Sequence, residues 1–406
     1  MNIKNYLRAG VISLLSFFAC APLARASHIV GADLYYTHVS GNTYKITVVL
    51  YGDCGPASAG AFSALPSATP SVCVYDGTSM MATVMLTPDV SGSNIEITPL
   101  CPGDTSQCTN PSSIVPGVKK FKYDGNYTLP HTSSLWRFVY QGYNAASGSA
   151  GRAAAITNIA SAGATMIQLI DTLNNTTYNN SSPALTVSQQ TFFCNAQHDN
   201  YTPGIVDPEG DSVVVSLVSA INGSGSASCS SSGSTVTYAG SAWPGTPVSA
   251  VKPLHVLADS FSIDSSTGKL VFHPNTLQRA VLVYNIREYR SGTLVGSSQR
   301  EMTVHVLDCT STFPCMLTAT TSNRVPANNS FEVYPNPAND ILHINTLINN
   351  GSLSITNEMG QTLMQSTVIS RDTKLDISFL PPGVYNITVI SSYDFKVHKF
   401  IKLYAF

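Results

Sequence analysis

The fold is decided by strand-forming stretches, and the clearest is Tyr44-Lys45-Ile46-Thr47-Val48-Val49-Leu50-Tyr51. Its β-branched and aromatic side chains favour an extended backbone. The turn residues Gly41-Asn42 stand directly before it, and Gly31–Val39 before them is again suited to a strand. We therefore predict a β-hairpin near the start of the mature chain, with residues 44–51 as its second arm.

The same alternation of short strands and turns continues along the chain. Ser212–Leu217 and Met302–Leu307 are rich in β-branched or other apolar residues, and Ser265-Ser266-Thr267-Gly268 separates two further strand candidates. Strands of this length and spacing are typical of immunoglobulin-like or cadherin-like sandwiches. The predicted fold class is therefore all-β, with tandem Ig/cadherin-like β-sandwiches and a small C-terminal β-sandwich.

Composition and turn signals divide the chain into five predicted parts. These are a signal peptide at 1–26, an N-terminal β domain at 27–183, a second sandwich at 184–309, a linker at 310–329 and a C-terminal domain at 330–406. The linker is rich in Ser and Thr, with almost no apolar periodicity, which fits an exposed tether.

The N-terminus has the layout of a secretory signal peptide. Lys4 and Arg8 precede an apolar run, and small residues lead to a predicted cleavage between Ala26 and Ser27. The alternative is a lipoprotein signal, because Phe17-Phe18-Ala19-Cys20 resembles a lipobox. The rest of the sequence contains no apolar run of the roughly 20 residues that a membrane-spanning helix needs.

Charge and cysteine content also indicate an extracellular protein. Charged residues make up 11% of the chain and the net charge is −2, which argues against nucleic acid as a partner. Of the nine cysteines, Cys20 is lost with the signal peptide, which leaves an even number for disulfides. Their pairing stays open, although short spacings favour local links Cys101–Cys108 and Cys309–Cys315. The eight disulfide candidates are Cys54, Cys73, Cys101, Cys108, Cys194, Cys229, Cys309 and Cys315.

The sequence offers little chemistry for catalysis. A Gly-x-Ser-x-Gly elbow and a His-Glu-x-x-His zinc motif are both absent from it. His255 and Asp259-Ser260 are close in sequence, but a catalytic triad is a spatial arrangement. We predict a non-enzymatic protein with no catalytic residues, and keep a secreted hydrolase of polysaccharide or peptide as the alternative.

One acidic cluster has two interpretations. Its members are Asp199, Asp207, Glu209 and Asp211, and clustered carboxylates in a loop supply the oxygen ligands that calcium prefers. In the second interpretation, residues 207–211 form a type I turn in which Asp caps backbone amides. The sequence therefore predicts no cofactor apart from the calcium alternative.

The last 76 residues carry a family resemblance. Phe331–Asp340 includes Tyr-Pro-Asn-Pro, and it is followed by Asn357–Gln361, Leu380–Tyr385 and the basic segment Lys396–Lys402. These motifs resemble the C-terminal sorting domain of proteins exported by the type IX secretion system of Bacteroidetes. The resemblance implies a β-sandwich that is recognised by the translocon and sorting machinery and then removed. It assigns the sorting signal to Pro335, Asn336, Pro337, Gly360, Gly383, Tyr385 and Lys399.

A second resemblance covers the preceding region. Ser27–Tyr36, Tyr51–Cys54, Asp207–Ser212 and Arg287–Gly292 are similar to segments of large Bacteroidetes surface proteins associated with gliding motility or adhesion. The resemblance implies a secreted or cell-surface protein on the exterior of the outer membrane. Its expected partners are the secretion machinery, surface lipopolysaccharide and an unknown extracellular glycan or protein.

Overall fold

The computed structural model describes residues 28–55, 62–100, 104–144, 150–189, 191–229, 233–309, 332–345, 351–357, 362–368, 372–390 and 395–403. The predictions for the signal peptide at 1–26, its cleavage between Ala26 and Ser27, and the linker at 310–329 lie outside these ranges. The same holds for Cys101, Cys315 and Gly360.

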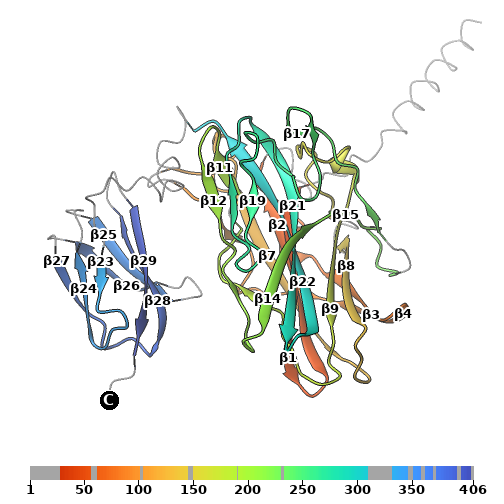
Figure 1. The fold of residues 1–406 in the computed structure, drawn as a ribbon, viewed down its shortest axis with the longest axis horizontal. Coiled ribbons are helices and arrows are strands. Elements are labelled where there is room, and N and C mark those ends of the chain that lie inside the picture. The colour runs from red at the N-terminus through yellow and green to blue at the C-terminus, as the bar shows by residue number, and fades with distance from the viewer. Residues whose placement is uncertain are drawn as a thin grey trace, which may run out of the picture.

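The described part of residues 28–309, here called the main body, is built from β-strands (Figure 1). It also contains two short 3₁₀ helices, Leu65–Ser67 and Ala162–Ala164. The strands are β1 (Ile29–Ser40), β2 (Thr43–Asp53), β3 (Pro70–Asp76), β4 (Ser79–Met85), β5 (Thr87–Pro88), β6 (Ile95–Glu96), β7 (Val118–Thr128), β8 (Trp136–Asn144), β9 (Ile167–Leu173), β10 (Ala184–Leu185), β11 (Phe192–Cys194), β12 (Asp199–Tyr201), β13 (Ile205–Val206), β14 (Ser212–Val218), β15 (Ile221–Asn222), β16 (Ser234–Thr235), β17 (Ser241–Trp243), β18 (Thr246–Pro247), β19 (Ser262–Ile263), β20 (Leu270–Phe272), β21 (Gln278–Arg290) and β22 (Thr293–Leu307).

The main path of the largest sheet has the order β4-β3-β8-β9-β22-β1-β2-β7-β5. Its two end strands are consecutive in the chain, because only Leu86 separates β4 from β5. The sheet therefore curves round a core to which Leu86 itself belongs. The predicted hairpin is present as β1 and β2, with Gly41 at φ +53° in the turn, a conformation that glycine adopts without steric cost.

The two predicted sandwiches are joined more closely than the sequence suggested. One core draws its buried residues from 29–173 and another from 193–306, while a third uses both regions. In addition, β1 pairs with β22, and Asp33 lies opposite Arg300. The all-β prediction with several packed sheets is confirmed, but the predicted boundary at 183/184 does not interrupt the sheet.

Three disulfides clamp the main body. They join Cys54 to Cys108, Cys73 to Cys229 and Cys194 to Cys309. The predicted local links Cys101–Cys108 and Cys309–Cys315 are wrong, because Cys108 and Cys309 are paired with distant cysteines. The physical reason is that strand packing brings together residues as far as 156 positions apart, so short spacing did not decide the partner.

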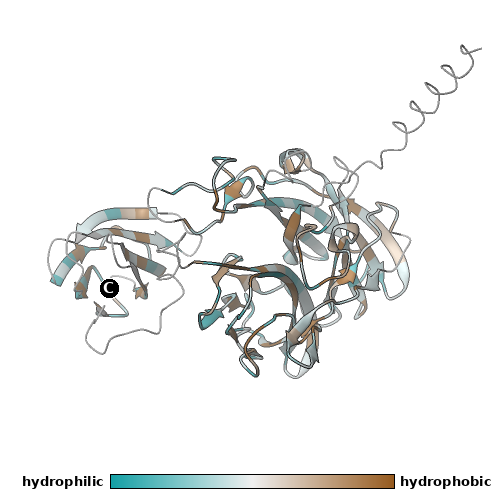
Figure 2. Cartoon of the chain, turned by 90° about the horizontal axis from the view of Figure 1, so that it is seen from above, coloured by the Kyte–Doolittle hydropathy of each residue, from teal (hydrophilic) through white to brown (hydrophobic). Residues whose placement is uncertain are grey.

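The C-terminal unit, residues 332–403, consists of a three-stranded sheet, β23-β24-β27, and a four-stranded sheet, β26-β25-β28-β29. Both contribute to one apolar core that includes Leu342, Ile355 and Phe400, and hydrophobic residues recur along the strands in Figure 2. No helix within the described ranges is long and apolar enough to cross a membrane. The strands are β23 (Glu332–Tyr334), β24 (Ile341–Asn345), β25 (Gly351–Asn357), β26 (Thr362–Val368), β27 (Asp372–Asp376), β28 (Gly383–Ile390) and β29 (Phe395–Lys402).

Candidate functional site

The Pro-Asn-Pro turn of the C-terminal unit is fastened to the last strand. The side-chain amide of Asn336 donates to the carbonyl of Lys399 at 2.9 Å, and its oxygen accepts from the amide of Ile401 at 3.0 Å. The flanking bonds Tyr334–Pro335 and Asn336–Pro337 are both cis. Asn336 therefore acts like one residue of a β-ladder, because its side chain both donates and accepts along β29.

The other sorting residues that the structure describes are strand residues around the same core. Tyr385 is buried, stacks on Phe400 with ring centroids 5.6 Å apart, and donates its hydroxyl to the carbonyl of Pro381 at 2.6 Å. Gly383 begins β28, and a Cβ at that position would meet only ordinary contacts. The side chain of Lys399 is exposed while its carbonyl holds Asn336.

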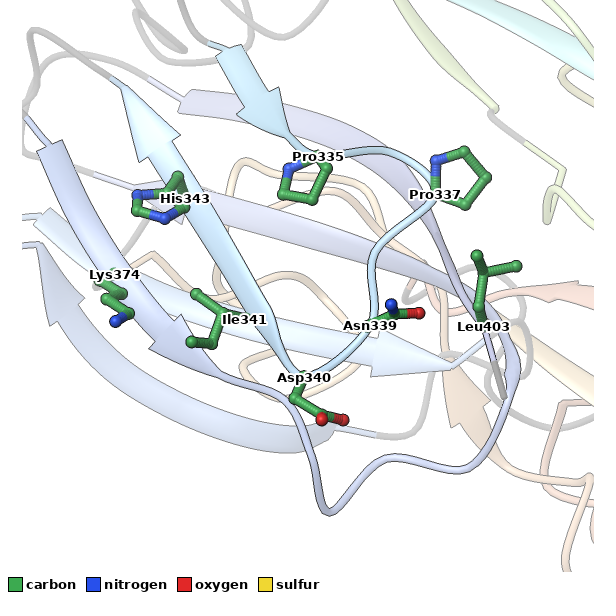
Figure 3. A pocket seen from close by; sticks show the side chains of 8 residues that line it. All are labelled: Pro335, Pro337, Asn339, Asp340, Ile341, His343, Lys374 and Leu403. Carbon is green, nitrogen blue, oxygen red and sulfur yellow. The ribbon is translucent and has the colours of Figure 1, made fainter. Parts of the chain in front are cut away.

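A shallow pocket of about 500 Å³ opens beside this turn (Figure 3). Pro335 and Pro337 line it from the turn, His343 from β24 and Lys374 from β27. The ring of His343 stacks on Tyr334 with an interplanar angle of 7°. The turn, β24 and β27 thus present one continuous surface.

The turn and the pocket lie within a region of the chain that matches a known protein family. Residues 332–403 match the secretion system C-terminal sorting domain. This sorting domain directs export by the type IX secretion system, so the protein goes to the cell surface or to the outside. It also implies an interaction with the type IX secretion machinery. Its match and its seven strands agree with the sorting-domain prediction, although the match does not identify the source organism.

Comparison of the whole chain adds no functional assignment. No curated protein sequence matches it. The Sidekick-1 immunoglobulin domains 1–5 are 7% identical with a TM-score of 0.17, and the comparison covers 92% of this chain and 59% of that one. PorZ, a surface component of the type IX secretion system of Porphyromonas gingivalis, is 13% identical with a TM-score of 0.18. That comparison covers 59% of this chain and 35% of PorZ. Similarities of this size carry no argument about fold or mechanism.

The predicted calcium residues do not form one site in the structure. Asp207 accepts backbone amide hydrogens from Glu209 at 3.0 Å and Asp211 at 2.7 Å, as in the turn interpretation. Both carboxylate oxygens of Asp211 accept from Arg290 at 2.7 Å. Asp199 is buried on β12. Within the described ranges, no group of three or more His, Cys, Asp or Glu side chains is placed to hold a metal ion, and calcium binding stays an untested prediction.

A buried acid lies behind this turn. Burial is the main cause that raises the pKa of Glu288 from 4.5 to about 8, and the charges of Asp207, Asp211 and Glu209 act in the same direction. Its Oε2 accepts from the amide of Asn180, a hydrogen bond that by itself lowers the pKa. Glu288 is thus held in its neutral form near pH 7 by its surroundings.

His255 and Ser260, which were considered as members of a catalytic triad, form hydrogen bonds with other groups. The ring of His255 contacts the side-chain oxygen of Asn275. The hydroxyl of Ser260 donates to the backbone carbonyl of Leu257 at 2.6 Å. Neither interaction activates Ser260 as a nucleophile, because activation needs a base hydrogen-bonded to its hydroxyl.

Two buried ion pairs were missed by sequence reasoning. Arg300 contacts Asp33 and Arg152 contacts Glu301, both with nitrogen–oxygen distances of 2.7 Å. All four side chains are 5% exposed or less. Asp33 also accepts from Tyr51 at 2.7 Å. The only available signal was the presence of charged residues within strands, and it applies to Asp33, Arg300 and Glu301 but not to Arg152, which lies outside the named strands.

Proposed function

We propose that this chain is a non-enzymatic adhesion protein, or a component of the surface or motility apparatus, that binds an extracellular glycan or protein. The observation that supports this most strongly is the sorting-domain match at 332–403, attached to a body of packed sheets. A disulfide-linked β-body presents rigid surfaces, and rigid surfaces lose little conformational entropy on binding.

The proposal includes the fate of the sorting domain. By the resemblance described above, the translocon recognises this domain, it is removed, and the remainder is attached to surface lipopolysaccharide. The mature protein would then begin at Ser27 and end between residues 310 and 330. Repeated copies anchored on one cell would bind a surface multivalently, which raises avidity without new contacts.

A gene deletion in the native host, complemented with either of two chains, tests the proposal. The first is the full chain, and the second lacks residues 332–403. We expect the full chain alone to be recovered at the surface, with a heterogeneous mass from attached lipopolysaccharide, and to restore adhesion or gliding. The proposed function is wrong if the full chain reaches the surface in the complemented strain, but the uncomplemented deletion strain adheres and moves like the wild type.

A further inference from the structure

The main body contains a cavity of about 320 Å³ that the sorting function does not use. It lies over one face of β7, β2, β1 and β22 and beneath the segment 181–188. Successive side chains of a strand point to opposite faces of the sheet. Tyr35 and Lys120 accordingly reach the cavity, while their neighbours Tyr36 and Phe121 are buried in the core. Its volume lies at the small end of the range for ligand pockets.

The lining contains three cations, Lys120, Lys122 and Arg300, and one anion, Asp33. Arg300 is neutralised by Asp33, and Lys122 contacts Asp89 at 2.9 Å and Asp124 at 3.3 Å. In contrast, the ammonium of Lys120 has no hydrogen-bond or ion-pair partner among the residues that the structure describes. A cation that lines a cavity without a protein counter-ion favours a ligand that carries negative charge.

The remaining lining suits a hydroxylated ring. Ser181 and Ser182 accept the backbone amide hydrogens of His38 and Tyr36, both at 3.1 Å, so each hydroxyl hydrogen remains to be donated. The phenol of Tyr35 is a neutral hydrogen-bond donor near pH 7, where tyrosine is protonated, and burial raises its pKa further, to about 12. Val49 and Leu185 supply apolar wall between these polar groups.

We propose that this cavity binds an acidic sugar unit of an extracellular glycan. The ammonium of Lys120 pairs with the carboxylate of the sugar. The hydroxyls of Ser181 and Ser182 and the phenol of Tyr35 form hydrogen bonds with the hydroxyls of the sugar ring. This inference rests on the proposed function, because it names the ligand through which an exported β-body would contact a glycan-coated surface. A neutral sugar leaves Lys120 unpaired, and a simple inorganic anion leaves the hydroxyls unused.

Calorimetry on the purified full chain tests this with glucuronic acid, glucose and inorganic phosphate as probes. We expect glucuronic acid to bind, glucose and phosphate to bind at least tenfold more weakly, and Lys120→Ala to weaken glucuronic acid about tenfold or more. Lys119→Ala is the matched control, because Lys119 is on the same strand, is not part of the lining and donates to Asn94 at 3.2 Å. Lys120→Met, which keeps most of the apolar stem, replaces Lys120→Ala if that variant does not fold.

The results separate the sugar from the wider function. Absence of glucuronic acid binding, equal binding of glucose or phosphate, or equal losses for Lys119→Ala and Lys120→Ala would each overturn the acidic-sugar proposal. If Lys120→Ala loses glucuronic acid but the cells still adhere, the cavity is supported as a sugar site and another surface mediates adhesion. If deletion of the whole gene leaves adhesion and motility intact, it is the proposed function that fails.

Discussion

Arg300 and Glu301 are consecutive on β22 and carry opposite charges, yet each is buried in an ion pair with a different partner. Successive side chains of a strand point to opposite faces of the sheet. Arg300 therefore meets Asp33 on one face, and Glu301 meets Arg152 on the other. Two buried pairs thus fix the position of β22 within the sheet from both sides.

Removing one partner of such a pair should destabilise the main body strongly. Arg152→Met leaves the carboxylate of Glu301 buried and unpaired, and it also removes donors to Thr165 and to the carbonyls of Met166 and Ile221. We expect the free energy of unfolding to fall by about 3–5 kcal/mol. Equilibrium denaturation in urea, followed by fluorescence and circular dichroism, measures this change.

Asp89→Asn is the comparison for an ion pair near the surface. Asp89 and Lys122 are 22% and 25% exposed, so breaking their pair should cost no more than about 1 kcal/mol. Equal effects of Arg152→Met and Asp89→Asn would contradict the importance assigned to the buried pair. The double variant Arg152→Met, Glu301→Leu should recover much of the loss, since no charge is then left unpaired.

The raised pKa of Glu288 should make stability fall as the pH rises. Between its ordinary value of 4.5 and about 8, the unfolded chain has released the proton that the folded chain still holds. The folded state binds more protons in this window, so the free energy of unfolding decreases with increasing pH. Over pH 6.5–8 the expected decrease is about 2 kcal/mol.

Glu288→Gln isolates this contribution because glutamine resembles the protonated acid and can still accept from Asn180. His305, whose pKa is lowered by burial to about 3, acts in the opposite direction only below its ordinary value of 6.5. Asp171, with a pKa raised well above normal mainly by burial, acts in the same direction in both proteins, although the charge of Glu288 contributes to its raised pKa in the wild type alone. A Glu288→Gln protein whose stability falls as steeply as that of the wild type over pH 6.5–8 would refute the assignment.

Local sequence pattern was sufficient to find strands but not their long-range partners. The predicted hairpin arms 31–39 and 44–51 lie within β1 and β2, and the predicted strands at 212–217 and 302–307 lie within β14 and β22. In contrast, the pairing of β1 with β22 joins residues more than 260 positions apart. No local period encodes such a contact, because it depends on how the cores pack.

The same reason explains what was missed at the candidate sites. The Pro-Asn-Pro segment was identified by its motif, but the ladder-like bonds of Asn336 to β29 required the folded strands. Arg152 and Glu301 were not recognised as buried, because charged side chains usually face solvent, and Arg152 lies outside the named strands. The sorting domain is a local feature and was predicted well, whereas a cavity formed by four strands and a covering segment was not.

The disulfide pairing can be read directly by peptide mapping under non-reducing conditions. We expect linked peptides that contain Cys54 with Cys108 and Cys194 with Cys309. Cys194→Ala with Cys309→Ala opens a link that spans 115 positions, and this should cost about 2–5 kcal/mol of stability. Recovery of a Cys101–Cys108 peptide would contradict the described structure.

The turn at 207–211 gives a prediction about calcium. Asp211→Asn breaks the two-point contact with Arg290, so the melting temperature should fall whether or not calcium is present. Excess calcium should raise the melting temperature of the wild type no more than that of an Asp207→Asn, Asp211→Asn variant. A calcium-dependent increase confined to the wild type would instead establish the calcium site that the sequence suggested.

The bonds of Asn336 should matter for export. Asn336→Ala removes the donor to Lys399 and the acceptor for Ile401, so we expect the turn to detach from β29 and the sorting domain to lose about 1–3 kcal/mol of stability. Less protein should then reach the surface and more should stay in the periplasm, measured by fractionation of the native host. Asn339→Ala changes an exposed asparagine that lines the pocket beside the same turn, and it should be exported normally. If Asn339→Ala reduces export while Asn336→Ala does not, the pocket surface, and not the fastening of the turn, is what the machinery requires.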